Sequence, residues 1–259
     1  MNNEYAAQAA QHARRLMELA SAYFRTRSEA ASEALVDLYP QTSAYRENGC
    51  AGYEGVLAIH AHILALRYVN EAYNPSKAFA FSRLAEQCYR DYLQSDALRA
   101  RPSAERETAQ RYLEHVWLLC AYVDYVQDNL PGAGDWLMKI PLERVGVSGV
   151  ALLACVQFRM LCEEGRDAFF QTAFALFQKM DEWFQAPVPY LFEEDILRTA
   201  YGFYEMYYTH GVVNPQLAVP YDPARAAAML RRAEALLTDA QQKAWMRQMA
   251  QQAAERGAE

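Results

Sequence analysis

The sequence predicts an all-α protein, an α-solenoid of about ten or eleven helices in antiparallel pairs. Ala, Leu, Gln, Glu and Arg are abundant, and only 11 glycines and 10 prolines occur among 259 residues, which favours helix over sheet. Apolar residues recur at three- and four-residue spacing in successive segments. Residues 74–87 also return as residues 222–235 with six of fourteen positions identical. Such a recurring unit is the signature of a helical repeat architecture.

The N-terminal segment predicts two helices followed by a loop. The first runs from about Asn3 to Arg25, and Ser28 is expected to cap a short second helix that ends near Tyr39 and Pro40. The polar stretch 41–52 contains two glycines and indicates a loop. The expected apolar positions of the first helix are Ala10, Ala13, Leu16, Met17, Ala20 and Phe24.

Residues 52–71 predict a helix that is apolar on two faces and therefore packed between two neighbours. Asn74 and Pro75 then supply an N-cap and a proline at the first helical position, and Asp222 and Pro223 open a later helix in the same way. The two expected stripes of the first of these helices are Val56, Ile59, Ile63 and Leu66, and Leu57, Ala61, Leu64 and Tyr68.

The second half of the chain continues the helical rhythm. Ser103 is expected to cap a helix that reaches about Gln127, with Tyr112, Val116, Leu119, Val123 and Val126 inside. The clearest break follows at 129–134, either a turn within one array, which its shortness favours, or a domain linker. One helical turn is expected at 136–140, followed by helices at 146–162, 166–184 and 193–208 and a loop at 212–221. A capping box at Thr238–Gln241 then precedes a final helix, whose apolar stripe is narrow and consists of Trp245 and Met249. The best β candidate, 145–150, is too isolated to build a sheet.

These elements group into one repeat domain that spans residues 1–259. The expected helix pairs are 3–39, 52–94, 103–139, 146–185 and 191–237, and a capping helix covers 238–257. A polar outer face on the last helix is what the end of a stack requires.

Two stretches resemble the Sel1-like repeat, a relative of the tetratricopeptide repeat. Leu64-Ala65-x-x-Tyr68 followed by Asn74–Ala78 is similar to its pattern, and so is Tyr207-Tyr208-Thr-His-Gly211 followed by Asp222–Ala226. The chain departs from the pattern at Ala65, Glu71 and Glu205, where the family has glycine. The resemblance implies a right-handed superhelix, and the residues expected to shape its repeats are Leu64, Tyr68, Pro75, Ala78, Ala85, Gly211, Pro223, Ala226 and Ala233.

The resemblance also implies a function. Proteins of this type mostly bind other proteins, so we expect a non-enzymatic scaffold or adaptor. A sharper version is a bacterial toxin-neutralising immunity protein, since an acidic inhibitor suits a basic toxin. The formal net charge of −7 fits a basic partner, although simple solubility explains the charge as well. The absence of a basic stripe argues against nucleic-acid binding.

Three features of the sequence indicate where in the cell the protein is found: its N-terminus, its apolar stretches and its cysteines. The N-terminus shows no secretory signal, and the longest uncharged stretch in the middle of the chain, 145–158, is shorter than the roughly 20 residues of a membrane span. The five cysteines (50, 88, 120, 155 and 162) lack disulfide or metal spacing. We therefore expect reduced thiols in a cytoplasmic protein without membrane contact, provided that no leader was removed.

No residue pattern commits the chain to a reaction, so we expect no enzyme activity, metal or cofactor. His60 and His62 point about 200° apart on a helix and cannot share a metal without help. No phosphate-binding or nucleophile motif is present.

The tyrosines near residue 204 are the strongest candidates for a binding surface. Tyr201, Tyr204 and Tyr208 share one helix face, and Glu205 lies within a turn of them. If exposed, this face, with Glu193, Glu194 and Asp195 at the start of the same helix, offers an aromatic and acidic patch for a Lys or Arg anchor; if buried, the tyrosines belong to the core. The rival from another class is a small-molecule-binding bundle or enzyme with a pocket lined by Tyr, Cys and Trp.

Overall fold

A computed structural model describes residues 3–26, 28–141, 144–164, 167–185, 193–204 and 222–256. All regular secondary structure in these ranges is α-helical, which confirms the all-α prediction, and the candidate strand at 145–150 lies mostly within a helix. No described helix has the length and apolar character needed to cross a membrane. The chain divides into two compact units, residues 1–129 and 130–259. The division falls at the break at 129–134, which the sequence predicts to be either a turn or a domain linker.

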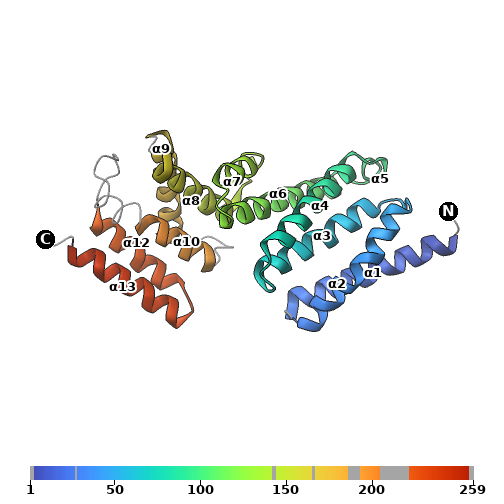
Figure 1. Cartoon of the computed structure of the whole chain (residues 1–259), viewed down its shortest axis with the longest axis horizontal. Coiled ribbons are helices and arrows are strands. Elements are labelled where there is room, and N and C mark those ends of the chain that lie inside the picture. Colours follow the sequence, from blue (N-terminus) through green and yellow to red (C-terminus); the bar gives the residue numbers. More distant parts are fainter. Residues whose placement is uncertain are drawn as a thin grey trace. The chain divides into compact units, whose positions relative to one another are not determined.

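The described residues of the first unit form six helices, drawn in blue to green in Figure 1: α1 (Asn3–Thr26), α2 (Glu29–Glu47), α3 (Tyr53–Asn70), α4 (Pro75–Gln94), the short α5 (Asp96–Arg99) and α6 (Ser103–Val126). The main contacts join α1 to α2, α2 to α3, α3 to α4 and α4 to α6, and smaller ones join α1 to α3 and α3 to α6. Helix α3 is therefore packed between neighbours, as its two apolar stripes predict. Leu57, Ala61, Leu64 and Tyr68 of its second stripe are all buried.

Helix α2 corrects the predicted end near Pro40 and the predicted loop at 41–52. It continues through Pro40 to Glu47, and the stretch that remains non-helical is 48–52. Proline within a helix removes one backbone hydrogen bond and disfavours it locally. Here the last two turns bury Thr42 and Tyr45, whose contacts offset that cost. Ser28 holds the N-cap position as predicted, but its side chain makes no capping hydrogen bond.

Two apolar faces were assigned wrongly in this unit. In α1 the buried face consists of Ala9, His12, Leu16, Ala20 and Tyr23, whereas Met17 and Phe24 are exposed. In α6 the predicted Val116, Leu119 and Val123 are buried, but Tyr112 and Val126 are exposed, and the N-cap is Pro102 rather than Ser103. The error in α1 arises because a histidine lies on the buried face, and a purely apolar pattern passes over it.

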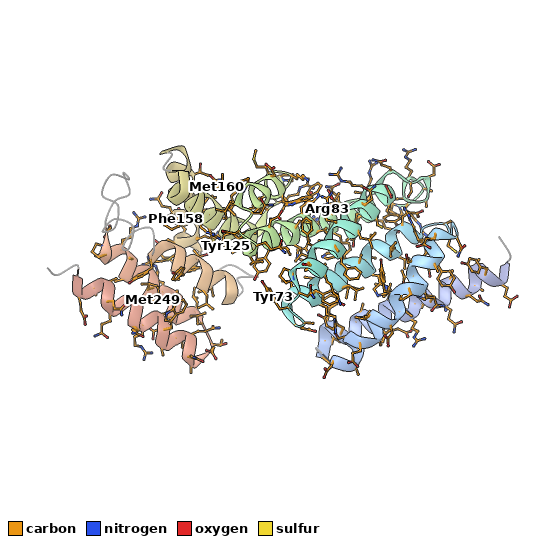
Figure 2. All side chains as sticks on the ribbon, in the orientation of Figure 1. Tyr73, Arg83, Tyr125, Phe158, Met160 and Met249 are labelled. Atoms are coloured by element: carbon orange, nitrogen blue, oxygen red, sulfur yellow. The ribbon has the colours of Figure 1, made fainter. Side chains whose placement is uncertain are left out.

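The second unit contains α7 (Leu130–Leu137), α8 (Gly146–Glu164), α9 (Asp167–Gln185), α10 (Glu193–Tyr204), α12 (Pro223–Leu236) and α13 (Ala240–Arg256). Main contacts join α7 to α8, α8 to α9 and α10, α10 to α12, and α12 to α13. Side chains occupy the spaces between neighbouring helices within each unit (Figure 2).

Three local predictions in this unit need correction. Residues 130–134, taken as a break, form the first turns of α7, because Leu130, Ala133, Trp136 and Leu137 are buried at helical spacing. The final helix begins at Ala240, so the N-cap position belongs to Asp239 rather than Thr238, and the Asp239 carboxylate accepts from Gln242 N at 2.8 Å. Its buried face is Met246, Met249, Ala250 and Ala253, while Trp245 is exposed.

The duplicated segment forms the same structure in both units. Asn74 Oδ1 accepts from Lys77 N at 3.0 Å, and Asp222 Oδ1 accepts from Arg225 N at 2.9 Å; a proline follows each cap. The equivalent alanines, 78 and 85 in α4 and 226 and 233 in α12, are buried. The Tyr68 ring stacks on Phe81 with centroids 5.7 Å apart and so reaches from α3 to α4. Gly211 and the predicted helical residues 205–208 lie outside the described residues.

Replacement of Asn74 or Asp222 by alanine should lower the free energy of unfolding by about 1 kcal/mol each, because a backbone N–H at the helix start loses its acceptor. Ser28→Ala is the matched control: Ser28 also holds an N-cap position but makes no capping bond, so its effect should stay within about 0.5 kcal/mol. Urea unfolding followed by circular dichroism measures all three variants. An equal loss in Ser28→Ala would contradict the assigned role of the two caps.

Candidate functional site

The structure describes only part of the predicted tyrosine face. Tyr201 is 46% exposed, and Tyr204 is half-buried. Glu205 and Tyr208 lie outside the described residues. Glu193, Glu194 and Asp195 occupy the first turn of α10, where acids complement the helix dipole, but their side chains are outside the described set.

Tyr201 does not stand alone on the surface. Its ring stacks on Trp245 of α13, with centroids 6.0 Å apart and 24° between the planes, and Trp245 is 43% exposed. Two large aromatic rings from different helices therefore form one continuous apolar surface that remains in contact with water. Tyr and Trp are the residues most enriched among those that dominate the energy of protein interfaces.

A chain of buried polar groups crosses the first unit and was not predicted. Tyr53 Oη lies 2.7 Å from Ala9 O and 3.0 Å from His12 Nδ1. The other nitrogen of His12 lies 3.3 Å from Thr42 Oγ1, which is 2.8 Å from His60 Nδ1. His60 Nε2 then lies 2.8 Å from Leu35 O. These contacts tie α1, α2 and α3 together through His12, Thr42, Tyr53 and His60, all of them buried.

The direction of each hydrogen bond follows from the carbonyl at each end of this chain. A carbonyl only accepts, so His60 Nε2–H donates to Leu35 O, and neutral His60 then accepts from Thr42 at Nδ1. Leu38 O, at 3.3 Å, is a more distant acceptor for the same hydroxyl. Tyr53 donates to Ala9 O at the other end. If all five contacts are hydrogen bonds, His12 must donate from both nitrogens, which requires a protonated ring.

Burial opposes that extra proton. Desolvation lowers the pKa of His12 and outweighs a hydrogen bond to the Leu38 backbone, which raises it; the Arg15 charge lowers it further. Desolvation also lowers the pKa of His60 to about 4, although its bond to Leu35 O favours the charged form. When both rings are neutral, the four side chains His12, Thr42, Tyr53 and His60 carry one hydrogen-bonding proton each, which is one fewer than the five contacts require. One additional proton on His12 would therefore complete the hydrogen bonds of this polar chain, and His12 is its member closest to solvent.

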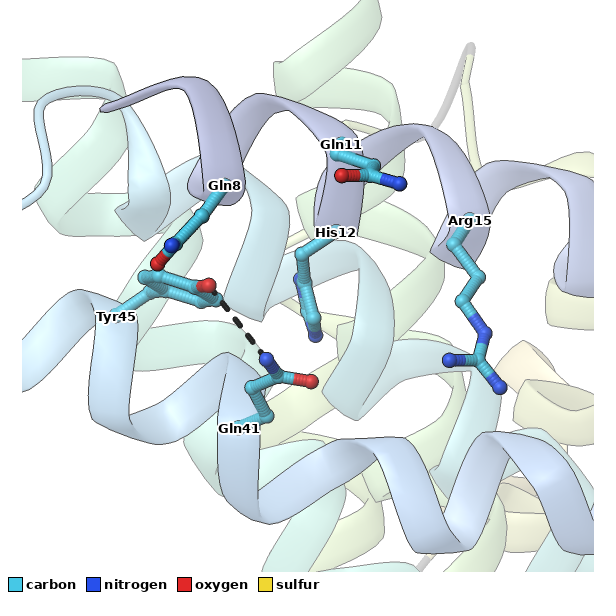
Figure 3. A pocket seen from close by; sticks show the side chains of 6 residues that line it. All are labelled: Gln8, Gln11, His12, Arg15, Gln41 and Tyr45. Carbon is cyan, nitrogen blue, oxygen red and sulfur yellow. Dashed lines mark hydrogen bonds between the residues drawn. The ribbon is translucent and has the colours of Figure 1, made fainter. Parts of the chain in front are cut away.

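A polar pocket of about 220 Å³ opens beside His12 between α1 and α2. Figure 3 shows His12 and Arg15 pointing from α1 toward α2, from which Gln41 and Tyr45 point back. Gln41 Nε2 donates to Tyr45 Oη at 3.5 Å. The lining residues are Gln8, Gln11, His12, Arg15, Gln41 and Tyr45.

The remaining described histidines pair on the other side of α3. His62 Nε2 lies 2.9 Å from His115 Nδ1 of α6, while His60 bonds to groups of α2. The two histidines of α3 therefore point apart, as their spacing predicts. No group of three or more metal-ligating side chains occurs among the described residues.

The described cysteines are poor nucleophiles by their surroundings. Cys50, Cys88, Cys120 and Cys155 are buried free thiols. Desolvation raises the pKa of Cys88 to about 11, so its thiol stays protonated at neutral pH. Neither the pocket beside His12 nor the open pocket between Glu33, Tyr68 and Lys77 is lined by cysteine or tryptophan.

Comparison of the chain with protein-family models, curated proteins and solved structures found no match. The Sel1-like resemblance therefore stays a prediction from the residues quoted above. One sequence signal did point to His12: it falls between Ala9 and Leu16 at the spacing of the buried face of α1.

Acidification should destabilise the first unit through its buried histidines. The unfolded pKa of histidine is about 6.5 and the folded pKa of His60 is about 4, so the unfolded chain binds more protons between these values. Stability is therefore lost as the pH falls through this window, by roughly 3 kcal/mol for His60 alone. Urea unfolding of wild type and His60→Gln at several pH values between 7 and 4 measures this loss. The variant, whose amide can replace both hydrogen bonds, should show a flatter profile, and identical profiles would rule out the role assigned to His60.

Proposed function

We propose that this protein is a non-enzymatic α-solenoid scaffold that binds another protein through the surface around Tyr201 and Trp245. The observation that carries the proposal is the exposed stack of these two rings. Burying them against a partner removes apolar area from water and loses little side-chain entropy, because packing against each other already restricts both rings.

The packing order of the helices supports a repeat array. In each unit the main contacts join a helix to its next or next-but-one neighbour in the described sequence, as for α1, α2 and α3, or for α8, α10 and α12. Repeat proteins share this nearest-neighbour pattern. Helices α4 and α12 also share the same N-cap hydrogen bond and the same buried alanine positions, as expected for two copies of one sequence segment.

The partner that suits this surface best is basic. The chain carries a net charge of −7, and an exposed tryptophan face attracts Lys or Arg side chains. An immunity protein that neutralises a basic toxin in the bacterial cytoplasm is the narrower form of this proposal.

The proposal is tested by Trp245→Ala and Tyr201→Ala in the full chain. A partner is first captured from lysate of the native cell with the wild-type protein, identified by mass spectrometry and purified. Each substitution should then weaken its binding by at least about tenfold, measured by titration calorimetry. The control is Tyr73→Ala, since Tyr73 of the first unit, labelled in Figure 2, is an exposed aromatic that makes no ring contact with any described residue.

Binding that survives both substitutions would refute this surface as the interface. Loss of binding counts in its favour only if the melting temperature of the variant stays close to that of wild type, because a large drop indicates that the two rings act in folding.

A second function, small-molecule binding, is favoured by the pocket beside His12. Its lining differs from the predicted Tyr, Cys and Trp: amides, one histidine, one arginine and one tyrosine surround it. Convergent polar groups around a concave site are typical of ligand recognition.

A further inference from the structure

We propose that the pocket between α1 and α2 binds a carboxylate, and that binding draws a proton onto His12. This site lies in the first unit, and the proposal is independent of the aromatic surface of the second. The ligand is either a small free carboxylic acid or the acidic side chain of a bound protein, and the chemistry at the pocket is the same for both.

The charge of the lining residues selects the ligand. Arg15 is exposed and has no ion pair with any described residue, and none of the six lining residues is acidic. Gln8 and Gln11 add amide groups that can donate hydrogen bonds. A guanidinium whose N–H donors are available binds a carboxylate more strongly than it binds a neutral ligand, because two charge-assisted hydrogen bonds can form. The chain as a whole has more acidic than basic residues, whereas this pocket is lined by one cationic residue and no acidic one.

The size of the pocket limits the ligand. A volume of about 220 Å³ on the open side of the pocket admits a short dicarboxylic acid or one acidic side chain. Because Arg15 is exposed to solvent, the affinity for a free acid should be weak, with a Kd on the order of 1 mM.

The hydrogen bonds of His12 link this pocket to the buried polar chain. Its nitrogens face Tyr53 and Thr42, and its ring packs on Tyr45 with centroids 5.1 Å apart. The other charged or titratable groups that face it are Arg15 from its own helix and His60 from α3. None of these supplies negative charge at neutral pH. A bound carboxylate would supply it, offset the effect of Arg15, and favour the protonated ring that completes all five hydrogen bonds.

The first experiment is calorimetric titration of the full chain with glutarate, with glutaramide as its uncharged analogue. Glutaramide should bind at least about tenfold more weakly, because it lacks the charge that Arg15 recognises. Arg15→Gln should raise the Kd for glutarate at least about tenfold, whereas the adjacent Arg14→Gln, which does not line the pocket, should change it less than about twofold. No binding at 20-fold the expected Kd, equal binding of glutaramide, or equal effects of the two arginine variants would overturn the proposal.

The second experiment measures the proton. Glutarate titrations at pH 7 in two buffers of different ionisation enthalpy should show net proton uptake on binding, and the Kd should fall as the pH is lowered from 8 to 6. The carboxyl groups of the ligand stay ionised over most of this range, since they titrate near pH 4 to 5. Proton release, or a Kd independent of pH, would refute the part assigned to His12. This readout uses the wild-type chain and so does not depend on whether a His12 variant folds.

A third arm separates the two sources of the carboxylate. A blocked pentapeptide with one central glutamate is titrated beside glutarate. Tighter binding of the peptide identifies the side chain of a protein as the ligand, and tighter binding of glutarate identifies a free acid. Both results support a carboxylate site, and failure of both probes to bind overturns it.

Discussion

The first unit depends on the burial of α3 from several sides at once. Most of its residues, including both of its histidines, are buried, and the helix contacts α1, α2, α4 and α6. A buried polar side chain has no access to water, so each histidine needs a partner within the protein. His60 finds one in Leu35 O and Thr42, and His62 finds one in His115. The polar chain and the histidine pair thus follow from placing two histidines on a buried helix.

The same enclosure explains why α2 continues past its proline. Thr42 and Tyr45 lie beyond Pro40, and both are fixed by groups of other helices: Thr42 by His12 and His60, and Tyr45 by ring contacts with His12 and Tyr53. If α2 ended near Tyr39, the contacts with Thr42 would be lost, and one ring nitrogen of His12 and one of His60 would remain buried without that partner. Each such group costs about 1–3 kcal/mol, comparable with the penalty of a proline within a helix.

These contacts separate what the sequence could predict from what it could not. The caps at Asn74 and Asp222 were predictable because the cap, the proline and the backbone N–H that donates to the cap lie within four residues. The double stripe of α3 was predictable for the same local reason. The course of α2 and the buried face of α1 were not, since both depend on side chains of three helices that meet only in the fold. The partner of Tyr201 was equally hidden, because Trp245 lies 44 positions further along the chain and on another helix.

Charged and aromatic groups in this protein fall into two kinds, and the difference points to function. Glu86 is buried, yet Arg83 and Arg90 pair with its carboxylate at 2.8 and 3.0 Å, and Trp117 donates to it at 3.3 Å. Asp181 is paired with Arg232 in the same manner in the second unit. The carboxylates of Glu86 and Asp181 therefore have their charged partners within the fold. Arg83 is labelled in Figure 2.

Arg15 and the Tyr201–Trp245 stack are of the other kind. Arg15 makes no ion pair with any residue that the structure describes, and the stacked rings of Tyr201 and Trp245 are both partly exposed to water. A positively charged pocket selects its ligand through charge, which salt screens, whereas an exposed aromatic surface adds the burial of apolar area, which salt does not weaken. Raising the ionic strength should therefore weaken a carboxylate held in the pocket more than a protein held on the aromatic surface, which distinguishes the two sites in the same molecule without any substitution.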